Sequence, residues 1–288
     1  MVVPLLMNRT LILGARGMLG TQLRALYSDA VAWDREDADV LDSAQFRAKV
    51  LALDPAPDVI VNCVAYNNVD GAEAQPDAAF ALNGEFPGRL ADLSVEIGAV
   101  LVHYSSNYVF DGLIGEYAED AVPSPLSVYG QSKLEGERQI AKRAANTWYV
   151  LRTAVLFGPK GESEVSKRSF VDLMLDLAAS RNRISAVSDE VNSVTYAPDL
   201  AAITRSVVAR RLPSGIYHAV NSGEASWYDF ACEIFRQAQK MVEVAPLPAS
   251  QMPRKARRPR RAVLRNTKLP PVRPWQAALE ECIREKHV

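Results

Sequence analysis

A phenol and an ammonium stand four residues apart in Tyr129-Gly130-Gln131-Ser132-Lys133, a spacing that places both groups on one face of a helix. A phenol in this setting can give its proton to a carbonyl oxygen while hydride reaches the carbonyl carbon. Its pKa must fall by about 3 units to approach neutrality, roughly 4 kcal/mol, which a nearby ammonium and an oxidised nicotinamide ring can supply. The motif predicts carbonyl reduction, and its structural alternative is a half-buried tyrosine beside a lysine that reaches solvent.

Two glycines and a pair of serines strengthen the chemical interpretation. Gly130 and Gly136 lie in a stretch with helical spacing, where each glycine costs about 1 kcal/mol, so we expect another group to approach the helix closely. Ser105-Ser106-Asn107 ends a predicted strand, and ligands of parallel sheets bind outside the carboxyl ends of their strands. A hydroxyl here could hold the same carbonyl oxygen as Tyr129, and a simple turn is the alternative.

A glycine-rich segment, Gly14-Ala15-Arg16-Gly17-Met18-Leu19-Gly20, follows a short apolar run and opens a helical pattern. Such a turn lets backbone N–H groups approach a pyrophosphate at the start of a helix. No GK[ST] follows, which argues against an ATP-type phosphate loop. Asp34 falls twenty residues after Gly14, where a carboxylate can bind ribose hydroxyls and favours NAD, whereas Arg35 could accept the 2′-phosphate of NADP. A structural glycine turn with a surface aspartate is the alternative.

Short continuous apolar runs alternate with helical patterns, as in βαβ units around a buried parallel sheet. The predicted strands are residues 11–13, 31–33, 59–61, 99–104 and 148–151, and the predicted helices include 18–27, 86–97 and 134–141. Ser226 and Asp229 form a capping-box pattern before another helix, and a last helix is expected near Trp275.

We therefore expect an α/β fold, with a Rossmann-type doubly wound parallel sheet and a smaller C-terminal substrate-binding lobe. Residues 1–155 are expected to form the dinucleotide-binding domain, to which the chain returns around 190–215. Residues 156–288 are expected to form mainly the substrate-binding lobe.

The composition argues against several classes of protein. The chain has 288 residues, and its 33 Lys and Arg against 34 Asp and Glu give a net charge of −1, which argues against a nucleic-acid-binding surface. No segment approaches the ~20 apolar residues of a membrane helix. The three cysteines and three histidines match no disulfide framework or zinc site, so we expect a reduced, cytoplasmic protein without a bound metal.

Together these motifs resemble an extended short-chain dehydrogenase/reductase, and longer segments resemble the dTDP-4-dehydrorhamnose reductase family. The segments are DVIVNCVAYNNVDGAEAQPDAAFALN (58–83), VHYSSNYVFDG (102–112), PSPLSVYGQSKLEGE (123–137), GIYHAVNSGEASWYDFA (215–231) and ARRPRRAVLRNTKL (256–269). The resemblance implies a nucleotide-sugar 4-ketoreductase that passes hydride from NADPH or NADH to C4 of dTDP-6-deoxy-L-lyxo-4-hexulose, giving dTDP-L-rhamnose. It implies a monomer or a homodimer.

The resemblance also implies a role for individual residues. Tyr129 would be the proton donor, Lys133 would bind the nicotinamide ribose and tune Tyr129, and Ser106 would polarise the substrate carbonyl. The implied cofactor-binding residues are Gly14, Gly17, Met18, Leu19, Gly20, Asp34, Asp39, Val40, Ala65, Tyr66, Asn67, Tyr104, Tyr129 and Lys133. The implied substrate-binding residues are Ser106, Asn107, Val155 and Arg258.

Three departures from the family pattern bear on the substrate. Asn107 replaces the usual acid of an STD or SSD triplet, and Val155 stands where a tryptophan is typical. Residues 260–262 read Arg-Arg-Ala where the family tends to have an Asn-Ser pair. None of the three changes Ser106, Tyr129 or Lys133, so the hydride chemistry is expected to persist.

Two alternatives therefore stay open: a reductase of another nucleotide-linked ketosugar, and a non-catalytic regulatory subunit resembling the methionine adenosyltransferase β subunit. Within the basic run 254–261, Arg258 lies in an Arg-Arg-Pro motif and suits a nucleotide diphosphate, because its guanidinium can donate two parallel hydrogen bonds. A solvated charged loop is the alternative for this run.

Overall fold

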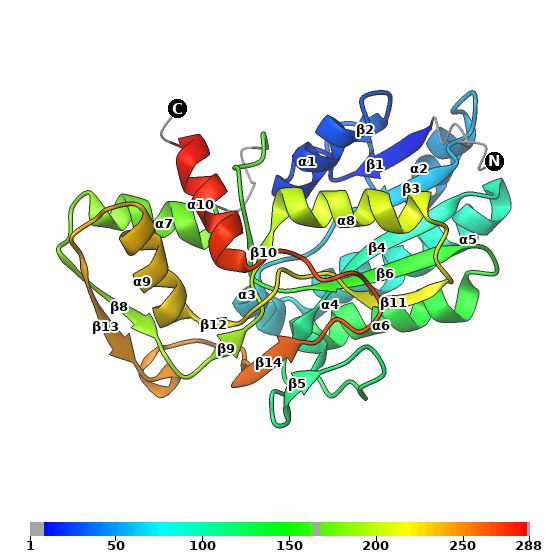
Figure 1. The fold of residues 1–288 in the computed structure, drawn as a ribbon. Coiled ribbons are helices and arrows are strands. Elements are labelled where there is room, and N and C mark those ends of the chain that lie inside the picture. Colours follow the sequence, from blue (N-terminus) through cyan, green and yellow to red (C-terminus); the bar gives the residue numbers. More distant parts are fainter. Residues whose placement is uncertain (1–8, 164–167, 287–288) are drawn as a thin grey trace.

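The computed structural model describes residues 9–163 and 168–286. In this part of the chain a six-stranded parallel sheet forms the larger lobe, in the order β11-β6-β4-β3-β1-β2 (Figure 1). Its strands are β1 (Thr10–Leu13), β2 (Val31–Trp33), β3 (Val59–Asn62), β4 (Val100–Ser106), β6 (Trp148–Thr153) and β11 (Gly215–His218). The chain places β2 and β3 on opposite sides of β1, which makes the topological switch point at which such sheets bind ligands.

Helices cover both faces of the sheet, as the apolar strand sequences require. On one face Leu19 and Leu23 of α1 (Met18–Leu26) pack with Leu200 of α8 (Ala197–Ala209). On the other face lie α2 (Ser43–Leu51), α5 (Phe86–Ile97) and α6 (Val128–Arg143), which bury Phe46, Phe86 and Ile140. The predicted Rossmann-type sheet with flanking helices is confirmed.

Most of the predicted elements differ from the observed ones only at their ends. β4 runs to Ser106, two residues beyond the prediction, because its pairing with β6 continues through Ser106 and Thr153. α6 begins at Val128, so that Tyr129 and Lys133 lie inside it, since the hydroxyl of Ser127 accepts the N–H of Gly130 and caps the helix. The prediction missed α2, α3 (Val69–Ala74), α4 (Pro76–Phe80) and the π-helix η1 (Ala81–Glu85).

The smaller lobe has its own core, in which Phe157, Phe230 and Trp275 pack together. Ser226 and Asp229 form the predicted capping box at the start of α9, and the last helix begins at Trp275 as expected. The other elements after β4 are η2 (Asn107–Val109), β5 (Gly115–Tyr117), β7 (Leu156–Phe157), α7 (Phe170–Ala178), β8 (Arg183–Val187), β9 (Val191–Asn192), β10 (Thr195–Tyr196), β12 (Ala225–Ser226), α9 (Trp227–Gln237), β13 (Glu243–Leu247), η3 (Ala249–Gln251), β14 (Arg261–Leu264) and α10 (Trp275–Lys286).

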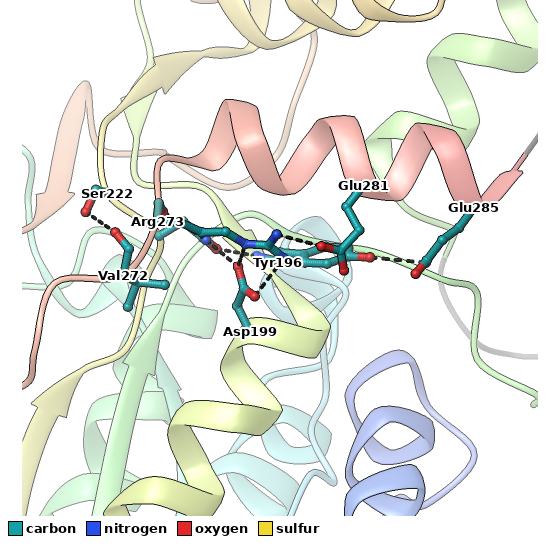
Figure 2. Close-up of polar contacts among 8 residues, drawn as sticks. Tyr196, Asp199, Ser222, Val272, Arg273, Glu281 and Glu285 are labelled. Carbon is teal, nitrogen blue, oxygen red and sulfur yellow. Dashed lines mark hydrogen bonds and ion pairs between the residues drawn. The ribbon is translucent and has the colours of Figure 1, made fainter.

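Arg273 joins the final helix to the larger lobe (Figure 2). Its guanidinium donates to both carboxylate oxygens of Asp199 on α8, at 2.8 Å each, and to Glu281 on α10 at 2.6 Å. It also lies 5.5 Å from the ring centroid of Tyr196, whose hydroxyl donates to Glu285. One cation therefore holds two carboxylates and an aromatic ring from elements that are far apart in the sequence.

The two glycines of α6 mark the places where other backbone segments touch this helix. A Cβ at Gly130 would lie 2.2 Å from the carbonyl oxygen of Tyr108, and a Cβ at Gly136 would lie 2.1 Å from that of Asn83 in η1. The expectation that another group approaches the helix closely at these glycines is confirmed. The close approach fixes α6 against η1 and the end of β4.

We predict that Gly136→Ala destabilises the protein by about 1–3 kcal/mol, because the added methyl overlaps a backbone carbonyl that cannot move alone. Urea denaturation measures this change. Gly88→Ala in α5 is the matched control, since its Cβ would meet only side-chain atoms of Gln139 and Arg143, and we expect a change below about 1 kcal/mol. Equal effects of the two substitutions would contradict the proposed backbone contact.

Candidate active site

The carboxyl end of β4 and the first two turns of α6 bring together the groups predicted to do chemistry. Ser106 is the last residue of β4, and Tyr129 and Lys133 lie on the buried face of α6. Tyr129 is 9% exposed and Lys133 is 3% exposed. The ring of Tyr129 packs edge-to-face against Tyr108, with 6.0 Å between the centroids. The alternative of a lysine that reaches solvent is wrong, because this ammonium is inside the protein.

Lys133 is held by the backbone of β4. Its Nζ donates a hydrogen bond of 2.7 Å to the carbonyl oxygen of Tyr104. Burial lowers the pKa of Lys133 to about 8, while the carboxylate of Glu137 opposes this change. An ammonium with a pKa near 8 changes its charge just above neutrality, which is typical of groups at functional sites.

Tyr129 keeps its proton at neutral pH in this environment. Burial raises the pKa of Tyr129 above its ordinary value, and a hydrogen bond with Ser106 opposes the rise. Burial and Ser106 are the causes of this shift, and the tuning of Tyr129 by Lys133 stays a prediction. A protonated phenol next to a serine hydroxyl is a proton donor, which suits the reductive direction.

The glycine-rich turn has the geometry of a pyrophosphate-binding loop. Gly14 adopts φ +72°, and a Cβ at Gly20 would lie 2.2 Å from the carbonyl oxygen of Gly14. Gly17 precedes α1 without a side-chain cap, so the first N–H groups of the helix, those of Met18 and Leu19, have no side-chain acceptor at this position. The glycines let the turn pack tightly on itself, and the first N–H groups of α1 could bind an anionic ligand.

Asp34 connects the end of β2 to this turn. One carboxylate oxygen accepts the N–H of Arg16 and the other accepts the N–H of Arg35, both at 2.8 Å. Asp39 is exposed and accepts the N–H of Leu41, and Val40 is half-buried against the core beneath α2. These residues surround the end of β2, where a Rossmann fold receives an adenosine.

Asn83 is a site residue that the sequence reasoning missed. Its side chain is fully buried and holds Tyr66 at both backbone atoms, accepting from N–H at 2.9 Å and donating to C=O at 3.1 Å. It also donates to the hydroxyl of Ser132 on α6. The loop Ala65–Asn67 is thereby fixed to the helix that carries Tyr129, with the ring of Tyr66 packed near it. The only signal was the position of Asn83 at the end of a family-like segment.

Asn107 connects the two lobes. Its side chain is buried, and its amide nitrogen donates to Asn192 Oδ1 at 2.8 Å and to the carbonyl oxygen of Ala262 at 3.0 Å. Its amide oxygen accepts the hydroxyl of Ser106 at 3.3 Å. A carboxylate could not donate these two bonds, which gives the departure from the family triplet a physical reason.

Tyr104 and Val155 were predicted to contact ligands, but their side chains pack against the hydrophobic cores. The ring of Tyr104 is buried under α8, and its hydroxyl forms a hydrogen bond of 2.7 Å with the hydroxyl of Thr204. The backbone carbonyl oxygen of Tyr104 accepts the hydrogen bond from Lys133. Val155 has φ +34°, which is unusual for a β-branched residue, and packs against the core of the smaller lobe.

Arg258 is folded onto α3, the short helix that follows β3. Its guanidinium binds Asp70 through two hydrogen bonds of 2.6 and 2.9 Å, and it also donates to the carbonyl oxygen of Ala256. The pairing holds the pKa of the Asp70 carboxyl well below its usual range. Arg258 also lies close enough to Tyr108 to act on the pKa of that phenol, which burial raises to about 12. Arg258 is therefore near Tyr108, whose ring packs against Tyr129, and it has a carboxylate as its partner.

Over the described ranges 9–163 and 168–286, no cluster of three His, Cys, Asp or Glu side chains is arranged to hold a metal ion. In the same ranges, none of the helices combines the length and apolar character that crossing a membrane requires.

We predict that Asn107→Asp destabilises the protein by about 1–3 kcal/mol at neutral pH, although it restores the usual family residue. The buried carboxylate would face the carbonyl oxygen of Ala262, which can only accept. Denaturant titration measures the change. Asn68→Asp is the matched control, because Asn68 only accepts a hydrogen bond, from the N–H of Gly71, and a carboxylate accepts it equally well. An Asn107→Asp variant with unchanged stability would show that the contact between the lobes does not depend on the hydrogen bonds of this amide.

Comparison with known proteins identifies the family to which the chain is similar. Residues 7–288 match the family model described as RmlD substrate binding domain. The chain is 38% identical to a dTDP-4-dehydrorhamnose reductase of Streptomyces griseus, over 95% of this chain and 92% of that protein. It is 35% identical to a dTDP-4-keto-6-deoxy-D-glucose reductase of Streptomyces niveus, over 95% and 96% of the two chains.

A solved structure of this family is also similar to the chain. The crystal structure of dTDP-4-dehydrorhamnose reductase from Bacillus anthracis in complex with NADP has a TM-score of 0.89 and 31% identity, covering 96% of this chain and 99% of that chain. The chain belongs to the dTDP-4-dehydrorhamnose reductase family.

Proposed function

We propose that this protein reduces the C4 keto group of a dTDP-linked 6-deoxy-4-ketosugar with NADPH or NADH, and that it converts dTDP-4-dehydrorhamnose to dTDP-L-rhamnose. The observation that carries the proposal is the meeting of Ser106, Tyr129 and Lys133 at the carboxyl end of β4, on the sheet whose β1 leads into a phosphate-binding turn. The names of the family members support the substrate class.

The bound nicotinamide cofactor supplies the hydride, and the residues of this chain bind and orient it. The N–H groups at the start of α1 receive the pyrophosphate, and the end of β2 receives the adenosine. Lys133, whose ammonium donates to the carbonyl oxygen of Tyr104, would bind the ribose next to the reacting ring.

Ser106 and Tyr129 act on the substrate carbonyl. The Ser106 hydroxyl donates a hydrogen bond to the oxygen of the ketone, which favours attack on the carbon. Tyr129 gives its phenolic proton to the same oxygen as the alcohol forms, and the charge of Lys133 then stabilises the phenolate until solvent returns a proton. The raised pKa of Tyr129 supports this direction, because the phenol is protonated when substrate arrives.

Arg258 is our proposed contact to the nucleotide diphosphate of the substrate. Arg258 binds Asp70 in the structure, so diphosphate would exchange with that carboxylate for the same two donors. Asn107 and Val155 would then lie on the sugar side. We further propose a cytoplasmic monomer or homodimer.

We predict that Tyr129→Phe lowers kcat at least about 100-fold and leaves the affinity for the cofactor unchanged, since only the transferable proton is lost. Tyr149→Phe is the control, because this buried tyrosine donates to the carbonyl oxygen of Leu212 far along the sheet. Cofactor oxidation with the ketosugar and fluorescence titration of the cofactor measure the two quantities. Similar turnover in Tyr129→Phe would contradict its role. Cofactor binding without turnover in the natural protein would favour the regulatory-subunit alternative.

We predict that Arg35→Ala raises the KM for NADPH roughly tenfold and leaves the KM for NADH unchanged. Arg35 is exposed beside Asp34 and forms no ion pair with the residues that the structure describes, so its guanidinium is available to a 2′-phosphate. Arg47→Ala is the control, because Arg47 is also exposed but forms an ion pair with Glu96 on α5. If the ratio of the KM for NADPH to the KM for NADH is the same in Arg35→Ala as in the natural protein, a role of Arg35 in NADPH binding is contradicted.

A further inference from the structure

Three ionisable side chains follow one another along the buried face of α6. Tyr129, Lys133 and Glu137 are spaced by four residues, and Glu137 is 3% exposed, as little as Lys133. Residues at this spacing are neighbours on a helix surface. The proposed function uses the first two groups and assigns nothing to the third.

Glu137 is held in place by an arginine from the sheet. Arg152 of β6 donates to both carboxylate oxygens, at 2.9 and 2.6 Å, and is itself 1% exposed. Its guanidinium lies 4.9 Å from the ring centroid of Phe110. The carboxylate therefore has a fixed position and a fixed orientation below Lys133.

A buried ion pair of this kind needs a reason other than stability. Removing two charges from water costs several kcal/mol for each ion, and well-packed apolar side chains often serve a core equally well. Arg152 lies opposite Ser105 in the β4–β6 register, one residue before the pair of Ser106 and Thr153. The ion pair is thus directly beneath the catalytic end of the sheet.

Glu137 provides the negative charge that Lys133 experiences. The groups that act on this ammonium are Glu137 on α6, Cys63 after β3, and His103 and the carbonyl oxygen of Tyr104 on β4. Tyr129 lies one helical turn before Lys133 on α6, and Arg152 of β6 binds Glu137. Burial raises the pKa of the Cys63 thiol and lowers that of His103, so both are neutral near pH 7. Among these neighbours Glu137 is the carboxylate, and its charge opposes the effect of burial on the pKa of Lys133.

We propose that Glu137, oriented by Arg152, is a positioning residue that keeps Lys133 charged and directed at the cofactor and Tyr129. The inference rests on the proposed function for the role of Lys133, although the charge of Lys133 can be measured without turnover. The pair would act through Lys133 and would touch neither substrate nor cofactor.

The test separates the charge of Glu137 from its part in packing. Glu137→Gln alone leaves a buried arginine without its carboxylate, which is expected to destabilise the fold strongly. The double variant Glu137→Leu/Arg152→Met removes both charges and keeps apolar volume between α6 and β6. Glu137→Asp is a control that retains the charge. Glu135→Gln is a second control, because it removes a carboxylate from the same helix that accepts a hydrogen bond from Gln139 and not from Arg152.

The first readout is the titration of Lys133 by NMR of protein labelled with ¹³C at lysine Cε, with the signal assigned from its loss in Lys133→Arg. We expect a midpoint near pH 8 in the natural protein, as in Glu135→Gln and Glu137→Asp. In the double variant we expect the midpoint to fall by about 1 pH unit. An unchanged midpoint in the double variant would overturn the proposal, and the pair would then serve packing alone.

The second readout is the pH dependence of kcat/KM for the ketosugar. Lys133 is charged below its pKa, so activity is constant there and falls as the pH rises through it. The fall should begin about 1 pH unit lower in the double variant. A double variant that matches the natural profile would overturn the proposal. Absence of turnover in the natural protein would instead contradict the proposed function, while the lysine titration would still decide the role of Glu137.

Discussion

The site depends on the contact between α6 and the backbone that surrounds it. Glycine at positions 130 and 136 lets the carbonyl oxygens of Tyr108 and Asn83 reach the helix surface, where a methyl group would overlap them. This contact sets the distance of α6 from the end of β4, and hence the position of Tyr129 relative to Ser106. The same π-helix that touches Gly136 carries Asn83, whose side chain holds the backbone of Tyr66. One packing contact therefore places both the proposed proton donor, Tyr129, and the Tyr66 segment that we propose lines the cofactor.

A second set of interactions holds the smaller lobe against this frame. Asn107 donates from the end of β4 to β9 and β14, Arg258 binds Asp70 on α3, and Arg273 links α8 to α10. All three use side chains with several donors in a fixed plane, so each can satisfy partners from different segments at once. The lobes meet where substrate is expected, and two of these residues are also candidates to contact it. If these residues bind substrate as proposed, substrate binding and lobe contact use the same groups.

Much of the larger lobe could be predicted from local sequence patterns. Continuous apolar runs identified the buried strands, and the capping box at Ser226 and the glycine-rich turn at 14–20 identified where helices begin. The glycines of α6 predicted close approach because their cost in a helix is large and local. Tyr129, Lys133 and Ser106 were found because a four-residue spacing and a strand end are both visible in the sequence.

The remainder depends on contacts across long stretches of chain. Nothing local distinguishes Asn83 from a surface amide, and its role appears only when η1 packs on α6. The hydrogen bond from Lys133 to the carbonyl oxygen of Tyr104 could not be predicted either, because it depends on how α6 packs on β4. Likewise, nothing in the local sequence marks Glu137 as buried. Its burial depends on Arg152, fifteen residues later, which the sheet places against it.

The central claim is that hydride reaches C4 of a dTDP-linked ketosugar at this site. The most direct test supplies NADH or NADPH deuterated at nicotinamide C4 on each face in turn, with the 4-keto substrate generated in place. We expect one deuterium at C4 of the product from one of the two faces, detected by NMR and mass spectrometry of the dTDP-sugar. Consumption of labelled cofactor without deuterium at C4, or no consumption with any dTDP-4-ketosugar despite bound cofactor, would contradict the account.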